Sequence, residues 1–195
     1  MTKGDETRQA VLDQAVEIAG RLGVAGLTLG TLATATGLSK SGLYAHFRSK
    51  EALQLAVLAD AREKFVDQVI RPALAADRGV PRIRTLFERW LRASREEAAG
   101  CLFVSAATEF DDQPGVVRDQ LVRDHRDLTD SIAQMYRSGV ADGQLRDDVA
   151  PEQFAHDMHG LLLGHFHACR LLHDPAADER ARYAFERLLH SIRSN

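Results

Sequence analysis

The stretch T-L-G-T-L-A-T-A-T-G-L-S-K-S-G-L-Y-A-H-F, from Thr28 to Phe47, decides how this chain folds. It predicts two short helices, one capped by Thr28 and ended by Gly37, and a second that begins after Ser39. Helices this short are unstable alone in water, so each must bury its apolar side chains against a third helix. Apolar spacing over about residues 7–22 supplies that third helix. The three segments together predict a helix-turn-helix.

Apolar residues recur at helical spacing through the rest of the chain, and no segment shows the sustained alternation of a half-buried strand. Glycine and proline mark the expected ends of the later helices. These are predicted over about residues 50–70, 81–98, 101–109, 114–139, 151–172 and 178–192. We therefore expect an all-α fold of nine helices in two domains. The helix-turn-helix domain spans 1–50, and a larger helical domain spans 51–195.

Composition and charge fit an ordered protein that presents one basic end. Of the 195 residues, 45% are hydrophobic and 27% are charged, which is ordinary for a globular chain. The net charge is −3, but the first 50 residues carry +2 and the remainder carries −5. This uneven distribution favours contact between the N-terminal module and phosphates.

The two cysteines, Cys101 and Cys169, lack the spacing of a zinc module or a disulfide framework. The polar N-terminus has no signal-peptide core, and no apolar run approaches the roughly 18 residues that span a bilayer. We expect a cytoplasmic protein with no membrane partner, no cofactor and no bound metal.

The second short helix has the features of a reading helix in the DNA major groove. Small residues at its N-terminal end let the backbone approach base edges, and polar groups at its far end suit phosphate contact. Unpaired amides at the start of the preceding helix also favour a phosphate. The predicted DNA-binding residues are Thr28, Thr31, Ser39, Lys40, Ser41, Gly42, Leu43, Tyr44, His46 and Lys50.

At these positions the segment resembles the N-terminal domain of the tetracycline-repressor family. The matching pattern consists of Thr28, Leu32-Ala33, Gly37-Leu38-Ser39, Leu43-Tyr44-Ala45-His46-Phe47 and Ser49-Lys50-Glu51-Ala52-Leu53. The resemblance covers about residues 7–60 by motif and the rest by helix number and spacing. It implies a regulator, usually a repressor, that binds a palindromic operator in double-stranded DNA as a homodimer. It also implies that the domain over 51–195 dimerises and binds a small-molecule effector.

The last two helices resemble the dimerising pair of that family. Gly160 and Gly164 stand four residues apart and let another backbone approach closely, either that of a second copy or that of a neighbouring helix in the same subunit. The predicted dimer-interface residues are Phe154, Gly160, Leu161, Gly164 and His167.

Large apolar side chains in the body are candidates for an effector cavity. Such residues at helical spacing also form ordinary cores, and the sequence leaves both interpretations open. The candidates are Phe87, Trp90, Cys101, Phe103, Phe110, Met135, Met158 and His159. Neither they nor the acidic excess distinguish a drug-like cation, a fatty acyl compound and a neutral metabolite.

A cluster of histidines stands at positions 156, 159, 165 and 167, with Asp157 and His173 nearby. The cluster raises the question of a metal site, but its spacing does not favour one. A metal needs three or four converging ligands, whereas His165 and His167 point to different sides of a helix. Polar contacts at a dimer seam or pocket wall are therefore the favoured interpretation.

Cys101 has two interpretations. In the first, Cys101 begins a helix, the helix dipole stabilises its thiolate, and the thiolate senses an electrophile. In the second, Cys101 is a small buried hydrophobic residue. Cys169, within an apolar helix, should be inert.

An enzyme is not expected, because the sequence has no recognisable nucleophile-base arrangement, phosphate loop or H-E-x-x-H motif. The alternative to a regulator is a helical small-molecule or metal-binding protein without DNA binding. Lys40, Tyr44, His46 and Lys50 favour the regulator.

Overall fold

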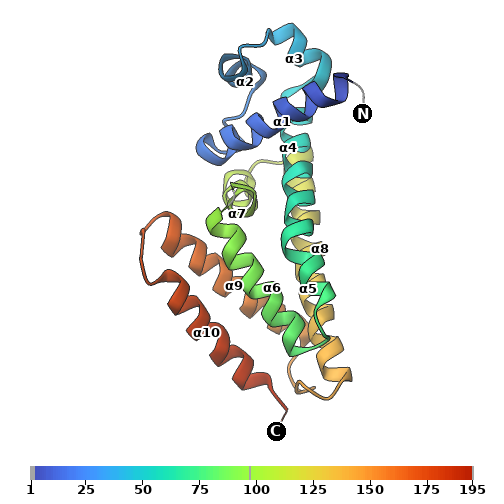
Figure 1. The fold of residues 1–195 in the computed structure, drawn as a ribbon, viewed down its shortest axis with the longest axis vertical. Coiled ribbons are helices and arrows are strands. Elements are labelled where there is room, and N and C mark those ends of the chain that lie inside the picture. Colours follow the sequence, from blue (N-terminus) through green and yellow to red (C-terminus); the bar gives the residue numbers. More distant parts are fainter. Residues whose placement is uncertain (1–2, 97, 195) are drawn as a thin grey trace. The chain divides into compact units, whose positions relative to one another are not determined.

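The computed structural model describes residues 3–96 and 98–194, with the side chains of residues 3–5, 96 and 98–101 left out. Its elements are helical, which confirms the all-α fold class (Figure 1). In chain order they are α1 (Lys3–Leu22), α2 (Leu29–Thr36), α3 (Lys40–Phe47), α4 (Lys50–Phe65), the π-helix η1 (Val66–Ile70), α5 (Arg71–Ala75), α6 (Val80–Glu96), α7 (Ala98–Phe110), α8 (Val116–Ala141), α9 (Pro151–Arg170) and α10 (Ala177–Ile192).

The predicted nine helical segments are present in the described residues if α4, η1 and α5 are taken as one, since they follow each other without a break. The predicted straight helix from Lys50 is wrong in detail, because a π-helical turn at Val66–Ile70 interrupts it. Pro72 lies in the first turn of α5, directly after this π-helical turn, so the irregularity falls where the chain has a residue that cannot donate a backbone hydrogen bond. Among the described residues, no helix has both the length and the apolar composition to cross a membrane.

The chain forms two compact units. Unit 1 contains Met1–Phe65 and Glu97–Val122, and unit 2 contains Val66–Glu96 and Arg123–Asn195. These units differ from the predicted domains because α4 and α7 pack with α1 beside the helix-turn-helix. The functional boundary near residue 50 remains a prediction.

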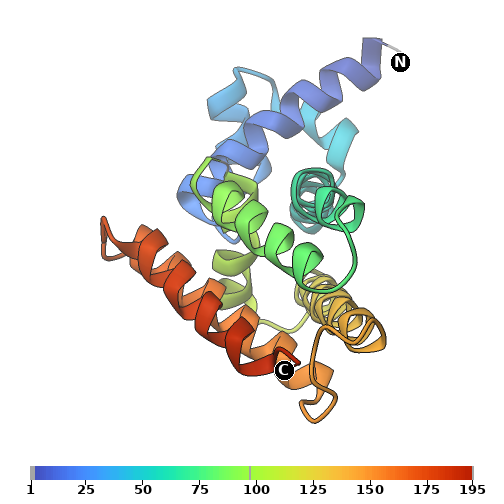
Figure 2. The same ribbon diagram turned by 60° about the horizontal axis from the view of Figure 1, so that its bottom comes forward.

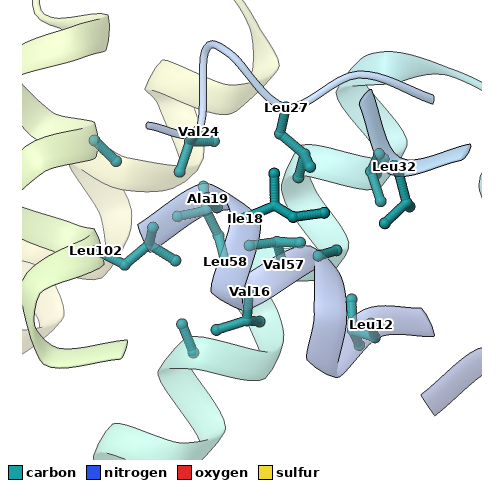
Figure 3. Close-up of a cluster of buried hydrophobic side chains, with 14 of the residues drawn as sticks. Leu12, Val16, Ile18, Ala19, Val24, Leu27, Leu32, Val57, Leu58 and Leu102 are labelled. Carbon is teal, nitrogen blue, oxygen red and sulfur yellow. The ribbon is translucent and has the colours of Figure 1, made fainter. Parts of the chain in front are cut away.

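Unit 1 has a hydrophobic core to which α1, α4 and α7 contribute (Figure 3). Leu12, Val16 and Ala19 of α1 belong to it, as do Val57 of α4 and Leu102 of α7. Burial of each Leu or Val side chain contributes about 1.5–3 kcal/mol, so this core fixes α1 as the support for the two short helices.

Unit 2 contains α9 and α10 side by side, with α6 against α9 (Figure 2). Phe87 of α6 stacks on Phe185 of α10, with ring centroids 3.9 Å apart and planes 4° from parallel. Tyr136 of α8 packs against Phe154 of α9, and its hydroxyl donates to the Arg146 carbonyl at 2.7 Å. These aromatic contacts hold the inner faces of the helices together.

Candidate functional site

The start of α2 is fixed by a reciprocal pair of threonines. Thr28 Oγ1 accepts a hydrogen bond from the Thr31 amide at 3.0 Å, and Thr31 Oγ1 accepts one from the Thr28 amide at 2.9 Å. Thr28 is therefore the N-cap that the sequence predicted. Because both hydroxyls are engaged locally, the groups left to meet a phosphate are the amides of Leu29 and Gly30, which precede the first helical hydrogen bond.

The turn between α2 and α3 requires glycine. Gly37 ends α2 with a φ of 70°, a left-handed conformation that side-chain-bearing residues rarely adopt. Ser39 then caps α3, because its Oγ accepts from the Gly42 amide at 3.1 Å. The serine predicted to contact DNA thus also sets where α3 begins.

The two sides of α3 have opposite roles. Leu43 and Phe47 are buried, with exposed fractions of 0% and 2%, whereas Lys40, Ser41 and Tyr44 are exposed. The prediction that Leu43 contacts DNA is wrong, since its side chain lies wholly in the core of unit 1.

Lys40 lies beside the start of α2. A Cβ placed on Gly30 would stand 3.8 Å from Lys40 Nζ, which is ordinary van der Waals contact, so the ammonium group lies close to the second residue of α2. The positive charge and the N-terminal end of the α2 dipole therefore act on the same region and favour an anion there. His46 is half-buried, and Lys50 is exposed at the first position of α4.

Two polar side chains that sequence reasoning missed secure the loop between α1 and α2. Glu109 Oε2 of α7 accepts from the Ala25 amide at 2.7 Å, and the buried Gln54 of α4 donates to the Val24 carbonyl at 2.7 Å. Glu109 is the one charged residue in the sequence of α7, and this isolation was the signal that could have identified it.

In unit 2, two of the predicted effector residues, Trp90 and His159, lie next to each other. Their ring centroids are 6.1 Å apart, and His125 lies 5.8 Å from His159 on another side. The Nε2 atoms of both histidines are buried and lack a hydrogen-bond partner among the described residues. Burial lowers the pKa of His159, and the neighbouring His125 and His156 lower it further. His125 was not predicted.

The other effector candidates are dispersed. Phe103 and Phe110 pack with the core of unit 1, while Phe87 and Met158 are fully buried in unit 2. Met135 lines a separate groove of about 610 Å³ in unit 2, beside Arg78 and Arg82. The side chain of Cys101 lies outside the described residues. α7 begins at Ala98, so Cys101 is not at its first position as expected.

The outer face of α9 and α10 is open within the subunit. A Cβ added to Gly160 or Gly164 would meet no atom of the described chain within 4 Å, so neither glycine makes room for a neighbouring helix of unit 2. A groove of about 340 Å³ lies there, lined by His156, Asp157, Gly160, Leu161, Ala184 and Leu188. His167 is exposed on α9.

Phe154 does not belong to this open face. Its exposed fraction is 0%, and its ring packs on Tyr136 inside the subunit, so its prediction as an interface residue is wrong.

Family models match both parts of the chain. The model for bacterial regulatory proteins of the tetR family matches residues 11–57, and the model for the tetracyclin repressor-like C-terminal domain matches residues 79–185. The chain belongs to the tetracycline-repressor family. It is a ligand-responsive, DNA-binding transcriptional regulator and not an enzyme.

Three known proteins are similar to this chain. The HTH-type transcriptional repressor DhaR of Mycobacterium sp. (strain GP1) is 28% identical over 151 residues, which are 76% of this chain and 74% of DhaR. A TetR transcriptional regulator from Chloroflexus aurantiacus has a TM-score of 0.87 and 26% identity over the whole of both chains. AibR, solved with isovaleryl coenzyme A and operator DNA, shares the fold, with a TM-score of 0.71 and 21% identity over 90% of this chain and 96% of AibR.

Proposed function

We propose that this regulator is a cytoplasmic repressor that binds a palindromic operator as a homodimer and leaves it when a small effector binds to unit 2. The observation that carries the proposal is the two-sided α3, in which Leu43 and Phe47 anchor the helix while Lys40, Ser41 and Tyr44 face outward. DhaR is a repressor, and AibR was solved on operator DNA, which supports this mode of action.

The DNA contacts divide into two kinds. Ser41 and Gly42 lie at the N-terminal end of α3, where short side chains suit base reading. Tyr44, Lys50 and the region shared by Lys40 and the start of α2 suit phosphate positioning. The Lys40 side chain is long enough to reach either a base or a phosphate. Variants of Lys40 will distinguish the two, because only loss of a base contact changes the preferred DNA sequence.

The second copy is proposed to cover the open face of α9 and α10. Apolar side chains are exposed there, with 39% of Leu163 and 68% of Tyr183 accessible to solvent. Gly160 and Gly164 leave space for a second backbone, and a dimer supplies the two reading helices that a palindromic site needs.

The effector is proposed to bind beside Trp90, His125 and His159. Two buried Nε2 atoms without partners are costly in an apolar surrounding unless a ligand pairs with them. Trp90 adds an apolar wall. We therefore expect an effector with an apolar body and a polar group that reaches the histidines.

Footprinting and gel shifts with DNA from around the gene for this protein test the DNA-binding part. Lys50→Gln should weaken binding to all sequences and lower the slope of log K against log salt by about one. Arg89→Gln is the matched control, because it removes an equally exposed positive charge from α6 in unit 2. Ser41→Ala should instead change the preferred sequence. Absence of any site-selective binding at low salt would overturn the proposal.

A further inference from the structure

Three side chains that serve none of these roles meet where α9 leads into α10. His165 Nε2 lies 2.8 Å from Asp178 Oδ1 and 3.3 Å from Cys169 Sγ. All three ligand atoms lie within 4.8 Å of one another. The side chain of His165 is completely buried, while Cys169 and Asp178 are partly open to solvent. A nitrogen, a sulfur and an oxygen therefore converge on one point.

Nε2 of His165 cannot donate to Asp178 and accept from Cys169 at the same time. If Nε2 carries a proton, it donates to Asp178 and has no lone pair left to accept the Cys169 thiol hydrogen. If Nε2 carries no proton, its lone pair faces a carboxylate. Nδ1 of His165 is buried without a partner among the described residues, so the polar contacts that the structure gives this ring are all made by Nε2.

We propose that His165, Cys169 and Asp178 bind a divalent transition-metal ion of the zinc type, with water at the fourth position. His165 and Cys169 are four residues apart on α9 and therefore share one face of the helix. Imidazole, thiolate and carboxylate are the ligands that zinc takes in proteins. This site is separate from the proposed effector region, and neither proposal depends on the other.

The two distances from His165 Nε2 are close to those of a zinc site, although hydrogen bonds and not a metal join the atoms here. With ordinary zinc bond lengths, tetrahedral nitrogen and oxygen ligands lie about 3.3 Å apart, and sulfur and nitrogen about 3.5 Å. The observed separations are 2.8 Å and 3.3 Å, so each pair must open by about half an ångström or less, which small side-chain rotations provide.

Asp178 presents one of its two carboxylate oxygens to the site. Arg95 binds the other oxygen, Oδ2, at 2.8 Å, which leaves Oδ1 directed at His165 and Cys169. Arg182 Nη1 lies 3.8 Å from Oδ2, so both guanidinium groups are on the side of Asp178 that does not face the site.

Metal binding displaces one proton. The Cys169 thiol gives its proton to the buffer, and the neutral imidazole of His165 changes tautomer, losing the Nε2 proton to solvent and taking one up at Nδ1, so that Nε2 can bind the metal. One thiolate and one carboxylate then balance the charge of the dication.

The sequence pattern gave this site no weight because Cys169 and Asp178 were not among the residues compared. His165 and His167 do point apart, but the second ligand of α9 is the cysteine one turn further on. The third ligand comes from the first turn of α10, and only the fold brings it to the other two.

Cobalt titration of the metal-free full-length protein tests the site, with Co²⁺ as the probe. We expect one Co²⁺ per chain and a thiolate-to-cobalt charge-transfer band that one equivalent of Zn²⁺ removes. Cys169→Ser should abolish the band. Cys101→Ser is the matched control, since the chain has two cysteines, and this variant should keep it.

Thermal unfolding provides a second measurement that does not depend on colour. Zn²⁺ should raise the unfolding temperature of the natural protein and of Cys101→Ser, but not that of Cys169→Ser or Asp178→Asn, because a ligand stabilises only the state that binds it. Circular dichroism without metal checks that the variants fold. Absence of the band in the natural protein, or its persistence in Cys169→Ser, would show that the cluster is only a hydrogen-bonded link between α9 and α10.

Discussion

Leu43 and Tyr44 are adjacent in the sequence but serve opposite sides of α3. Leu43 is 0% exposed and Tyr44 is 60% exposed. Successive residues of an α-helix point about 100° apart, so one of two neighbours can be fully buried while the other reaches the solvent. The family motif contains both residues, and only the phase of the helix shows that Tyr44 is exposed while Leu43 is buried.

The lowered pKa of His159 predicts how the free energy of unfolding depends on pH. Its pKa lies below the ordinary value of 6.5, chiefly because of burial, so the unfolded chain takes up a proton at this residue more readily than the folded chain. The free energy of unfolding should therefore be largest above pH 6.5 and should fall as the pH drops from 6.5 towards the lowered pKa. Urea unfolding at fixed protein concentration between pH 8 and about pH 5 measures this loss.

His159→Gln should reduce that loss, since glutamine does not titrate in this range. His190→Gln is the control, because His190 is an exposed histidine on α10. Equal pH dependence in the natural protein and in His159→Gln would rule out His159 as the source.

At the scale of elements, Glu109 secures the loop that leads into the helix-turn-helix. Its carboxylate accepts from the Ala25 amide, and Gly23 approaches it so closely that an added Cβ would stand 2.5 Å from the carboxylate. Glu109→Ala leaves the half-buried amide without its acceptor and should cost about 1–3 kcal/mol in the free energy of unfolding. Because this loop positions α2, operator affinity should also fall.

Glu109→Gln keeps an oxygen acceptor for Ala25 and should lose less than the alanine variant in both measurements. The difference in the free energy of unfolding between the two variants then separates the neutral part of the hydrogen bond from the part that depends on the charge of Glu109. If both variants unfolded like the natural protein, the loop would be held by Gln54 and the apolar core alone.

Local patterns predicted most elements of this fold. The cap at Thr28, the start of a helix after Ser39 and the turn at Gly37 depend on residues next to each other in the chain, and the structure confirms all three. The π-helical turn at Val66–Ile70 was missed, because the sequence around it keeps helical spacing on both sides. Local signals thus identify helices well and their internal irregularities poorly.

The site residues that were missed depend on contacts between distant segments. His125 becomes notable only when α8 brings it to His159, and Glu109 only when α7 reaches Ala25 of the preceding loop. Such pairs have no spacing signature in one sequence, so they had to come from the structure.

At the scale of the whole molecule, the chain passes between the two units within helices. α4 runs directly into η1 at the boundary after Phe65, and α8 contains the boundary between Val122 and Arg123. Since unit 1 carries the proposed DNA contacts and unit 2 the proposed effector contacts, these helices are covalent routes between the two functions.

The final prediction concerns assembly. In the single chain a side chain at Gly160 would point into open space, and replacing an exposed helical glycine by a better helix former stabilises a helix by up to about 1 kcal/mol. In a dimer that packs backbones at this point, the same side chain forces the subunits apart at a cost on the order of 1–3 kcal/mol. Gly160→Leu should therefore leave each chain folded, shift sedimentation towards monomer at micromolar concentration and weaken binding to a two-fold operator. Asp130→Leu places a leucine at an exposed position of α8 and should change neither measurement. If Gly160→Leu sedimented as a dimer and gave the natural footprint, the second copy would have to dock on another surface, and the exposed Leu163 and Tyr183 would need a different partner.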